Sequence, residues 1–248
     1  MKIKVLSYNI HKGFDWKNQN YTLDRIKEII TDSGADLVFL QEVVGENQKF
    51  KDKGLIDEQF EFLADTIWSH YSYAQNAIYD HGHHGNLILS KYPIENWENT
   101  SLTTNRFEKR GLLMAEIKPP QLEGRSIFAM CLHLNLLHSD RVKQYQIVME
   151  KVQEIVVENN SPIILAGDFN DWNKKSPRYF ELELEMTDAY KSINGSFAKT
   201  FPAQFPFLAL DRVYIKNLKV IQAKTISMPM NISPSDHIPI YCELEFYE

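Results

Sequence analysis

Apolar positions recur every second residue in some segments and every three to four residues in others, which predicts strands interspersed with helices. Residues 2–10 alternate as a strand does, and 238–246 repeat the pattern. Continuous apolar runs at 37–40 and 163–166 are typical of strands covered on both faces. Further strands are expected at 71–79, 86–90, 111–118, 125–133, 210–216 and 219–227.

Three other segments carry apolar residues at helical spacing. Thr22 can cap the first helix, and Gly34 ends it because glycine readily adopts the left-handed backbone of a helix terminus. A second helix is expected over about 60–68, and the longest begins at Ser139 or Asp140. Strand meanders with a few helices indicate two packed sheets flanked by helices.

The composition, 44% hydrophobic and 24% charged, is ordinary for a globular protein. No apolar run approaches the roughly 20 residues that span a bilayer, and the N-terminus is patterned as a strand rather than a signal peptide. No linker or repeat divides the sequence, so we expect one α/β domain over 1–248, in the cytoplasm. Cys131 and Cys242 lack metal-site spacing and are expected to be buried, inert thiols. The net charge of −6 weakens, without excluding, a nucleic-acid partner.

Polar side chains stand at the ends of four predicted strands. These residues are Asn9, Glu42, His133, and Asp168 with Asn170. Ligand sites in α/β proteins gather beyond the carboxyl ends of strands, so we expect these side chains to converge.

Three more polar residues lie near the last strands: Asp211, Asp236 and His237. In a regular strand, Asp236 and His237 would point to opposite faces. Both serve one pocket only if the chain turns between them, and Pro239 marks an irregular strand entry where such a turn fits.

The residue types suggest a chemistry. Glu42, Asp236 and Asn9 offer oxygen ligands, which suit Mg²⁺ or Mn²⁺. His237 with an aspartate partner can transfer protons near neutral pH, and Asp168 can deprotonate a water. Taken singly, Asp168 and Asp236 are better explained as turn formers, His133 is more often a satisfied core residue, and Glu42 could be a solvated strand end. The set is what predicts phosphate-ester hydrolysis.

At these residues the sequence resembles the endonuclease/exonuclease/phosphatase superfamily, which includes DNase I-like nucleases, neutral sphingomyelinases and inositol-polyphosphate 5-phosphatases. The matching motifs run in order along nearly the whole chain: Ser7-Tyr8-Asn9-Ile10, Leu40-Gln41-Glu42, Gly85-Asn86-Leu87-Ile88-Leu89-Ser90, His133-Leu134, Gly167-Asp168-Phe169-Asn170, Leu210-Asp211-Arg212 and Ser235-Asp236-His237. The resemblance implies a four-layer α/β sandwich of two mostly antiparallel sheets with helices outside.

The resemblance also implies roles. Glu42 would be the principal Mg²⁺ ligand, supported by Asn9 and Asp236. His237 would contact the scissile phosphate, oriented by Asp211.

Further roles concern the water and the phosphate. Asp168 would position or deprotonate the attacking water, with Asn170 and His133 holding the phosphate. Arg110 resembles an arginine that some members place near the phosphate, and Arg106 competes for that assignment.

The segments 9–14 and 82–86, together with Trp172, resemble a compact bacterial subgroup of the family. The segment 80–85 holds three histidines. Zinc is not favoured, because no fourth ligand lies nearby. We interpret the segment as a mobile loop over the site, with His84 and Asn86 as substrate contacts. The residues after Asn9 and Glu42 depart from those of apurinic-site endonucleases, which puts abasic-DNA repair in doubt.

Two further segments bear on the substrate. The apolar stretch 201–208 is interpreted as loop packing, or alternatively as a wall beside the phosphate for a lipid tail or nucleobase. The basic runs at 49–53 and 174–178 are interpreted as solvated faces.

The favoured function is a Mg²⁺- or Mn²⁺-dependent phosphodiesterase that acts on a small or lipid-linked phosphate ester. A DNA or RNA nuclease is the alternative, because the chemistry is the same. A catalytically silent binding scaffold is a more remote one.

Overall fold

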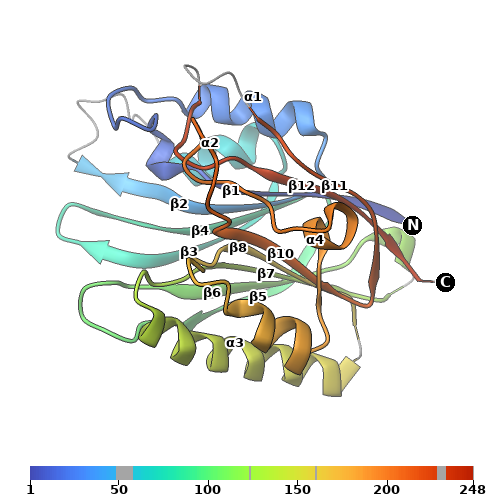
Figure 1. Ribbon diagram of the computed structural model, residues 1–248. Coiled ribbons are helices and arrows are strands. Elements are labelled where there is room, and N and C mark those ends of the chain that lie inside the picture. Colours follow the sequence, from blue (N-terminus) through green and yellow to red (C-terminus); the bar gives the residue numbers. More distant parts are fainter. Residues whose placement is uncertain (49–57, 123, 160, 228–232, 248) are drawn as a thin grey trace.

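The computed structural model describes residues 1–48, 58–122, 124–159, 161–227 and 233–247, and these form two six-stranded sheets (Figure 1). The first sheet has the order β11 (Leu218–Thr225), β12 (Ile240–Phe246), β1 (Lys2–Asn9), β2 (Leu37–Asn47), β4 (Gly82–Ser90) and β3 (His70–Tyr79). The second has the order β5 (Ile94–Ser101), β6 (Gly111–Ile117), β7 (Ile127–His133), β8 (Ile163–Asp168), β10 (Asp211–Lys216) and β9 (Thr187–Asp188).

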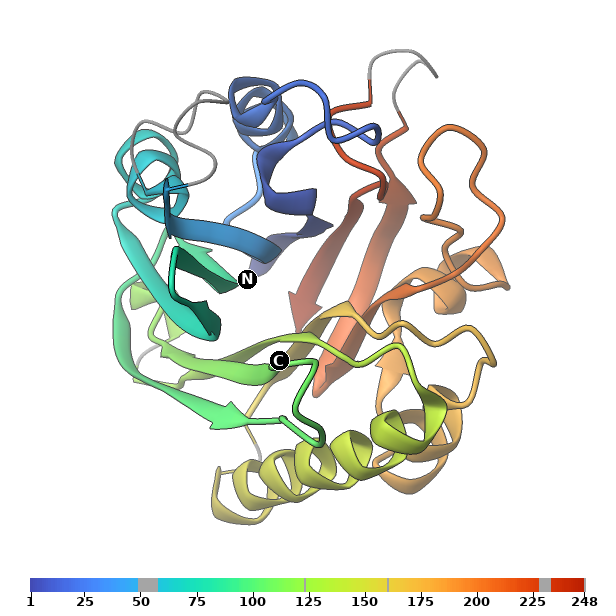
Figure 2. The same cartoon turned by 90° about the vertical axis from the view of Figure 1, so that its left-hand side faces the viewer.

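Each sheet is built around one parallel pair. In the first sheet β1 runs parallel to β2, and in the second β7 runs parallel to β8, while the other pairs are antiparallel. The carboxyl ends of β1, β2, β7 and β8 lie at one edge of the sandwich, which we call the polar edge. It lies opposite the two chain termini in Figure 1 and faces the viewer in Figure 2.

Helices cover the outer face of each sheet. α1 (Leu23–Ser33) and α2 (Gln59–Thr66) pack on the first sheet, and α3 (His138–Asn159) and η4 (Arg178–Glu183) pack on the second (Figure 1). A third apolar cluster fills the space between the sheets and includes both buried cysteines. Three apolar layers separating four layers of elements confirm the predicted α/β sandwich. No described helix is long and apolar enough to cross a membrane.

The predicted strands and helices are largely present, but several predictions were wrong. The edge strand β5 was missed because its side chains are mostly exposed and polar, so neither spacing marks it. Residues 82–85 are not a mobile loop but the start of β4. His83 pairs with β3 there, and His84 pairs with both β3 and β2.

Helix starts also differ from the predictions. α3 begins at His138, so Ser139 and Asp140 lie inside its first turn, where Asp140 accepts a hydrogen bond from Asn105. Thr22 holds the N-cap position of α1, but its hydroxyl donates to the carbonyls of neighbouring segments rather than to the helix. Gly34 ends α1 in a left-handed conformation, as predicted. The basic run at 49–53 lies outside the described residues.

Gly167 brings the two parallel strands of the second sheet together at the polar edge. Its φ is +147°, and a Cβ there would lie 2.0 Å from the Leu132 carbonyl oxygen, which is backbone and cannot move aside. Only glycine therefore allows β8 to lie this close to β7 immediately before Asp168.

Replacing Gly167 with alanine should destabilise the fold by roughly 2–5 kcal/mol, since backbone strain and a backbone clash add together. Gly195→Ala is the matched control. Gly195 also has a positive φ of +72° but nothing lies within 4 Å, so its cost should be nearer 1 kcal/mol. Chemical denaturation measures both, and equal losses would contradict this account of the close strand approach.

Candidate active site

Three predicted residues lie in one row across the second sheet at the polar edge. His133 and Asp168 are register partners on β7 and β8, and Asp168 is the register partner of Asp211 on β10. Asn9, at the end of β1, donates from Nδ2 to Asp168 Oδ2 at 3.1 Å and so joins the two sheets. The strand ends therefore converge as predicted.

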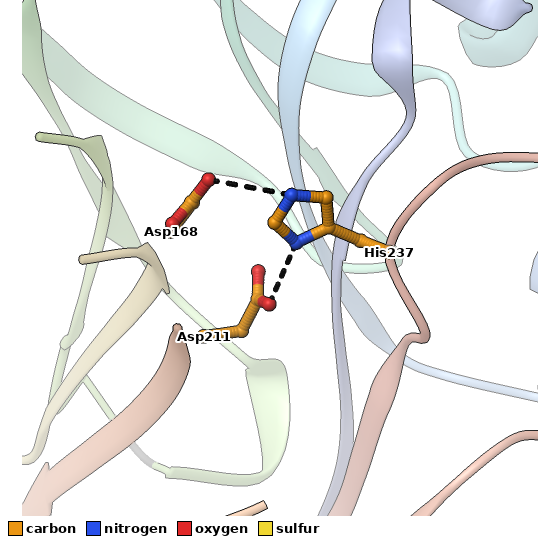
Figure 3. A group of neighbouring side chains, drawn as sticks. All are labelled: Asp168, Asp211 and His237. Atoms are coloured by element: carbon orange, nitrogen blue, oxygen red, sulfur yellow. Dashed lines mark hydrogen bonds and ion pairs between the residues drawn. The ribbon is translucent and has the colours of Figure 1, made fainter. Parts of the chain in front are cut away.

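His237 lies between two carboxylates of this row (Figure 3). Its Nδ1 is 2.8 Å from Asp211 Oδ2, and its Nε2 is 3.7 Å from Asp168 Oδ2. Burial alone would lower the pKa of His237, but Asp211 and Asp168 outweigh it and raise the pKa to about 10. His237 is therefore an imidazolium at neutral pH, with an N–H directed at each carboxylate.

The chain turns before β12, as the sequence argument required. Residues 233–239 precede the strand, which begins only at Ile240. Within this turn the Ser235 hydroxyl donates to the Asn9 carbonyl and accepts from the His237 backbone N–H. These two bonds attach the turn to the end of β1 and place His237 in the row of carboxylates.

Glu42 reaches the site from a bulge in β2. The register against β4 shifts between Leu40 and Val43, and Glu42 has a φ of +59°. A bulge redirects a side chain, and left-handed backbone at a non-glycine residue is strained, a feature that clusters at functional sites. Burial alone would raise the pKa of Glu42, but the hydrogen-bonded Lys12 ammonium and the neighbouring His133 and His11 together outweigh burial and hold the pKa far below its usual range.

Lys12 was given no role by the sequence argument, although it lies in the segment after Asn9. Its Nζ is 2.6 Å from Glu42 Oε2. The contact depends on the short helix η1 (His11–Gly13), where Lys12 has a φ of +58°. No periodicity signals such a local backbone conformation.

His133 lies between the Glu42 and Asp168 sides of the site. Its Nδ1 is 4.0 Å from Glu42 Oε1, and its Nε2 is 3.5 Å from Asp168 Oδ2. Burial and the Arg110 guanidinium lower the pKa of His133 to about 3, so its imidazole is neutral. Arg110 Nη1 lies 3.5 Å from Nδ1 and can only donate, so Nδ1 is the acceptor and Nε2 carries the proton.

Asp236 belongs to the Glu42 side of the site. Its Oδ1 is 3.8 Å from His11 Nδ1. Burial raises the pKa of Asp236, and the nearby Glu42 charge acts in the same direction. Because the Glu42 charge disfavours a second negative charge on Asp236, a cation between the two would favour the ionised form of both.

The predicted substrate contacts line a small cleft beside Glu42 and His133. His84 and Arg110 both line it, and burial lowers the pKa of His84 to about 4. Asn86 also lines it, but its Nδ2 donates to the backbone carbonyls of Gly111 and Cys131.

Asn170 lies beside the row of His133, Asp168 and Asp211 rather than free in the cleft. Its backbone N–H donates to Asp168 Oδ1, and its side-chain Nδ2 donates to the Leu134 carbonyl. Thr200, which had no sequence signal, donates its hydroxyl to Asp211 Oδ2. These bonds fix the orientation of both aspartates.

The ligand types favour Glu42 over the His237 group as the place for a divalent cation. Asp168, Asp211 and His237 are close enough to share an ion. However, both ring nitrogens of His237 face carboxylates in the metal-free protein, so an ion bound there would first have to displace a proton from the imidazole. Glu42, Asp236 and the Asn9 amide offer oxygen atoms, and the Lys12 ammonium already shows that Glu42 attracts a positive charge.

The two histidines should show opposite protonation states in metal-free protein at pH 7. Imidazole nitrogen NMR should find His237 doubly protonated and His133 neutral with its proton on Nε2. The contribution of His237 to stability, from a raised pKa, should be complete below about pH 6.5 and lost as pH rises through about 10. Asp211→Asn should lower the His237 pKa; an unshifted titration in that variant would contradict the pairing.

Comparisons with known proteins agree with this geometry. The sequence profile of the Endonuclease/Exonuclease/phosphatase family matches residues 6–237. The uncharacterized protein YbhP of Escherichia coli K12 is 38% identical over 244 residues, which cover 97% of this chain and 95% of that protein.

Solved structures share the fold. An endonuclease/exonuclease/phosphatase from Beutenbergia cavernae superposes with a TM-score of 0.81 at 19% identity, over 99% of this chain and 72% of that one. A mannosyl-6-phosphatase from Bacteroides thetaiotaomicron superposes with a TM-score of 0.72 at 21% identity, over 98% and 100%. With a family profile spanning the site from β1 to His237, the chain belongs to the endonuclease/exonuclease/phosphatase family.

Proposed function

We propose that this protein is a Mg²⁺- or Mn²⁺-dependent phosphodiesterase that hydrolyses its substrate by in-line attack of a water activated by Asp168. The observation that carries the proposal is that an acidic group able to bind a metal and a row of acid–base side chains meet at the polar edge. An ionised Glu42 lies on one side, and a row of His133, Asp168 and Asp211 with His237 lies on the other.

Glu42, Asp236 and Asn9 would hold the metal. When bound, the ion would neutralise charge on the phosphate and stabilise the leaving oxygen. Lys12 must leave Glu42 Oε2, at least in part, for an ion to take that position.

Asp168 is the group best placed to accept the proton of the attacking water. Its carboxylate is held by the Asn9 amide on one oxygen and the Asn170 backbone N–H on the other. Both bonds fix the direction of the carboxylate, and a general base must lie in a fixed position relative to the proton that it accepts.

The phosphate would meet hydrogen-bond donors around Asp168. In the free protein His237 and His133 both direct Nε2 toward Asp168, and the Arg110 guanidinium lies beside His133. These N–H groups would turn to the phosphate oxygens when a substrate binds. Donors placed in advance stabilise the charge that develops on a pentacovalent phosphorus, which is where electrostatic catalysis acts.

The substrate is proposed to be a small or lipid-linked phosphodiester. The net charge of −6 does not favour a long nucleic acid held by its phosphates. The similar fold of the Bacteroides thetaiotaomicron mannosyl-6-phosphatase, named for a small phosphate ester, supports a small substrate. A cytoplasmic location is part of the proposal, and the unpaired thiols Cys131 and Cys242 are compatible with a reducing compartment.

The experiment is a hydrolysis screen with Mn²⁺ or Mg²⁺ against bis-aryl phosphate, phospholipid and plasmid DNA, with EDTA as the metal-free control. Turnover of the aryl diester or the phospholipid that stops in EDTA supports the proposal. Rapid nicking of DNA with the other substrates untouched would make the protein a nuclease. No turnover of any substrate would leave a binding scaffold.

A further inference from the structure

Exposed apolar side chains are concentrated on the loops that surround the polar edge of the second sheet. Three loops, at 134–137, 169–177 and 195–210, follow or precede the strand ends that carry His133, Asp168 and Asp211, and a fourth, at 102–110, precedes β6, which pairs with β7. Six of their side chains are between 41% and 78% exposed, and we call them the apolar rim: Phe107, Leu136, Leu137, Trp172, Phe205 and Phe207.

Two hydrogen bonds and one ring contact join these loops into one surface. The Leu136 backbone N–H donates to the Glu108 carboxylate, which links the first loop to the second. The Asn170 side chain donates to the Leu134 carbonyl, which links the second to the third. Trp172 packs edge-on against Phe201, which links the third to the fourth. The fourth loop, which joins α4 (Ala189–Asn194) to β10, is orange in Figure 2 and extends outward beside the sheets.

The exposed charges of these four loops are all positive, although the whole chain has a net charge of −6. Their acidic residues are either buried, as Asp171 is, or paired, as Glu108 is with Arg110. The exposed cations on the loops are Arg106, Lys109, Lys174, Lys175 and Lys199. A surface that mixes apolar tips with cations complements an anionic lipid interface, where apolar side chains enter the acyl boundary and lysines meet the headgroups.

Single-stranded nucleic acid fits this surface less well. Nucleic-acid grooves use aromatic faces on which bases stack. Leu136 and Leu137 are 55% and 62% exposed, and aliphatic side chains cannot stack on a base as aromatic rings do. Both are explained by contact with acyl chains.

We infer that the apolar rim docks the protein on an anionic phospholipid surface, so that the substrate of the proposed phosphodiesterase is a phospholipid presented by that surface. The substrate assignment rests on the proposed function, whereas docking does not. Because the rim borders the row of His133, Asp168 and Asp211, insertion of the loop tips would place headgroup phosphates beside the catalytic side chains.

The test is co-sedimentation with vesicles of phosphatidylglycerol and phosphatidylcholine in equal parts. The parent protein should bind, and the double variant Phe205→Ser/Phe207→Ser should bind roughly 10-fold or more weakly, because two phenyl groups lose burial. Tyr247→Ser is the matched control. Tyr247 is 60% exposed, comparable to the 56% of Phe207, but follows β12 at the opposite edge, so binding should be unchanged.

Turnover of soluble bis-aryl phosphate should be equal in all three proteins, which separates docking from catalysis. Vesicle binding lost only in the rim variant, without hydrolysis of any ester, would support docking and reject the proposed function. Equal vesicle binding by parent and rim variant would overturn the inference. A rim variant that loses single-stranded DNA binding, in a protein that ignores vesicles, would overturn it in favour of nucleic acid.

Discussion

Replacing Asp168 with asparagine should lower phosphodiester turnover by roughly 10²–10⁴-fold, the range in which general-base contributions fall. The amide keeps the shape of the side chain and can still accept from the Asn170 backbone N–H. It cannot accept a proton from water, so the loss should fall on kcat. Steady-state kinetics on bis-aryl phosphate with saturating Mn²⁺ measure the effect.

Asp188→Asn is the matched control for this variant. Asp188 is buried to a similar degree, 3% exposed against 2% for Asp168, and lies in the same sheet. Its carboxylate accepts from the Lys191 backbone and lies near the Arg212 guanidinium rather than in the row that contains Asp168. Asp188→Asn should weaken folding while the folded enzyme keeps its turnover. Equal kcat in the Asp168 variant and the parent would show that another group activates the water.

Replacing Glu42 with glutamine should lower Mn²⁺ affinity by more than about 100-fold, and turnover with it, because loss of a ligand exceeds the effect of changing a supporting residue. The amide removes the negative charge of the Glu42 carboxylate, whose Oε2 accepts a hydrogen bond from Lys12 Nζ at 2.6 Å in the parent protein. Isothermal calorimetry with Mn²⁺ measures affinity independently of activity.

Lys12→Met tests the Glu42 site by removing the ammonium that pairs with its carboxylate. This variant keeps the Glu42 carboxylate and removes the cation that competes for it, so Mn²⁺ affinity should hold or rise. Weaker Mn²⁺ binding in Lys12→Met, or unchanged binding in Glu42→Gln, would show that the ion binds elsewhere.

The row of His133, Asp168 and Asp211 could be predicted because apolar runs in the sequence mark where strands begin and end. His133 and Asp168 terminate apolar runs, and the register of parallel strands then sets them side by side. Asp211 opens its strand, and antiparallel pairing returns it to the same edge. These positions follow from periodicity alone, without knowledge of any loop.

The rest depends on backbone features that periodicity does not carry. The direction of Glu42 follows from a bulge, and that of Lys12 from a left-handed residue in a short helix. Thr200 reaches Asp211 because its loop folds back on the turn before β12, where the Ile238 N–H donates to the Thr200 carbonyl. The edge strand β5 was missed because an exposed strand needs no apolar face.

The most direct test is a crystal structure of the protein with Mn²⁺, with the ion located by anomalous scattering. The account predicts one strong peak about 2.1 Å from a Glu42 carboxylate oxygen, the usual distance for such ions, with the Lys12 ammonium displaced. A peak inside the Asp168, Asp211 and His237 group instead, with the Lys12 and Glu42 pair intact, would contradict it.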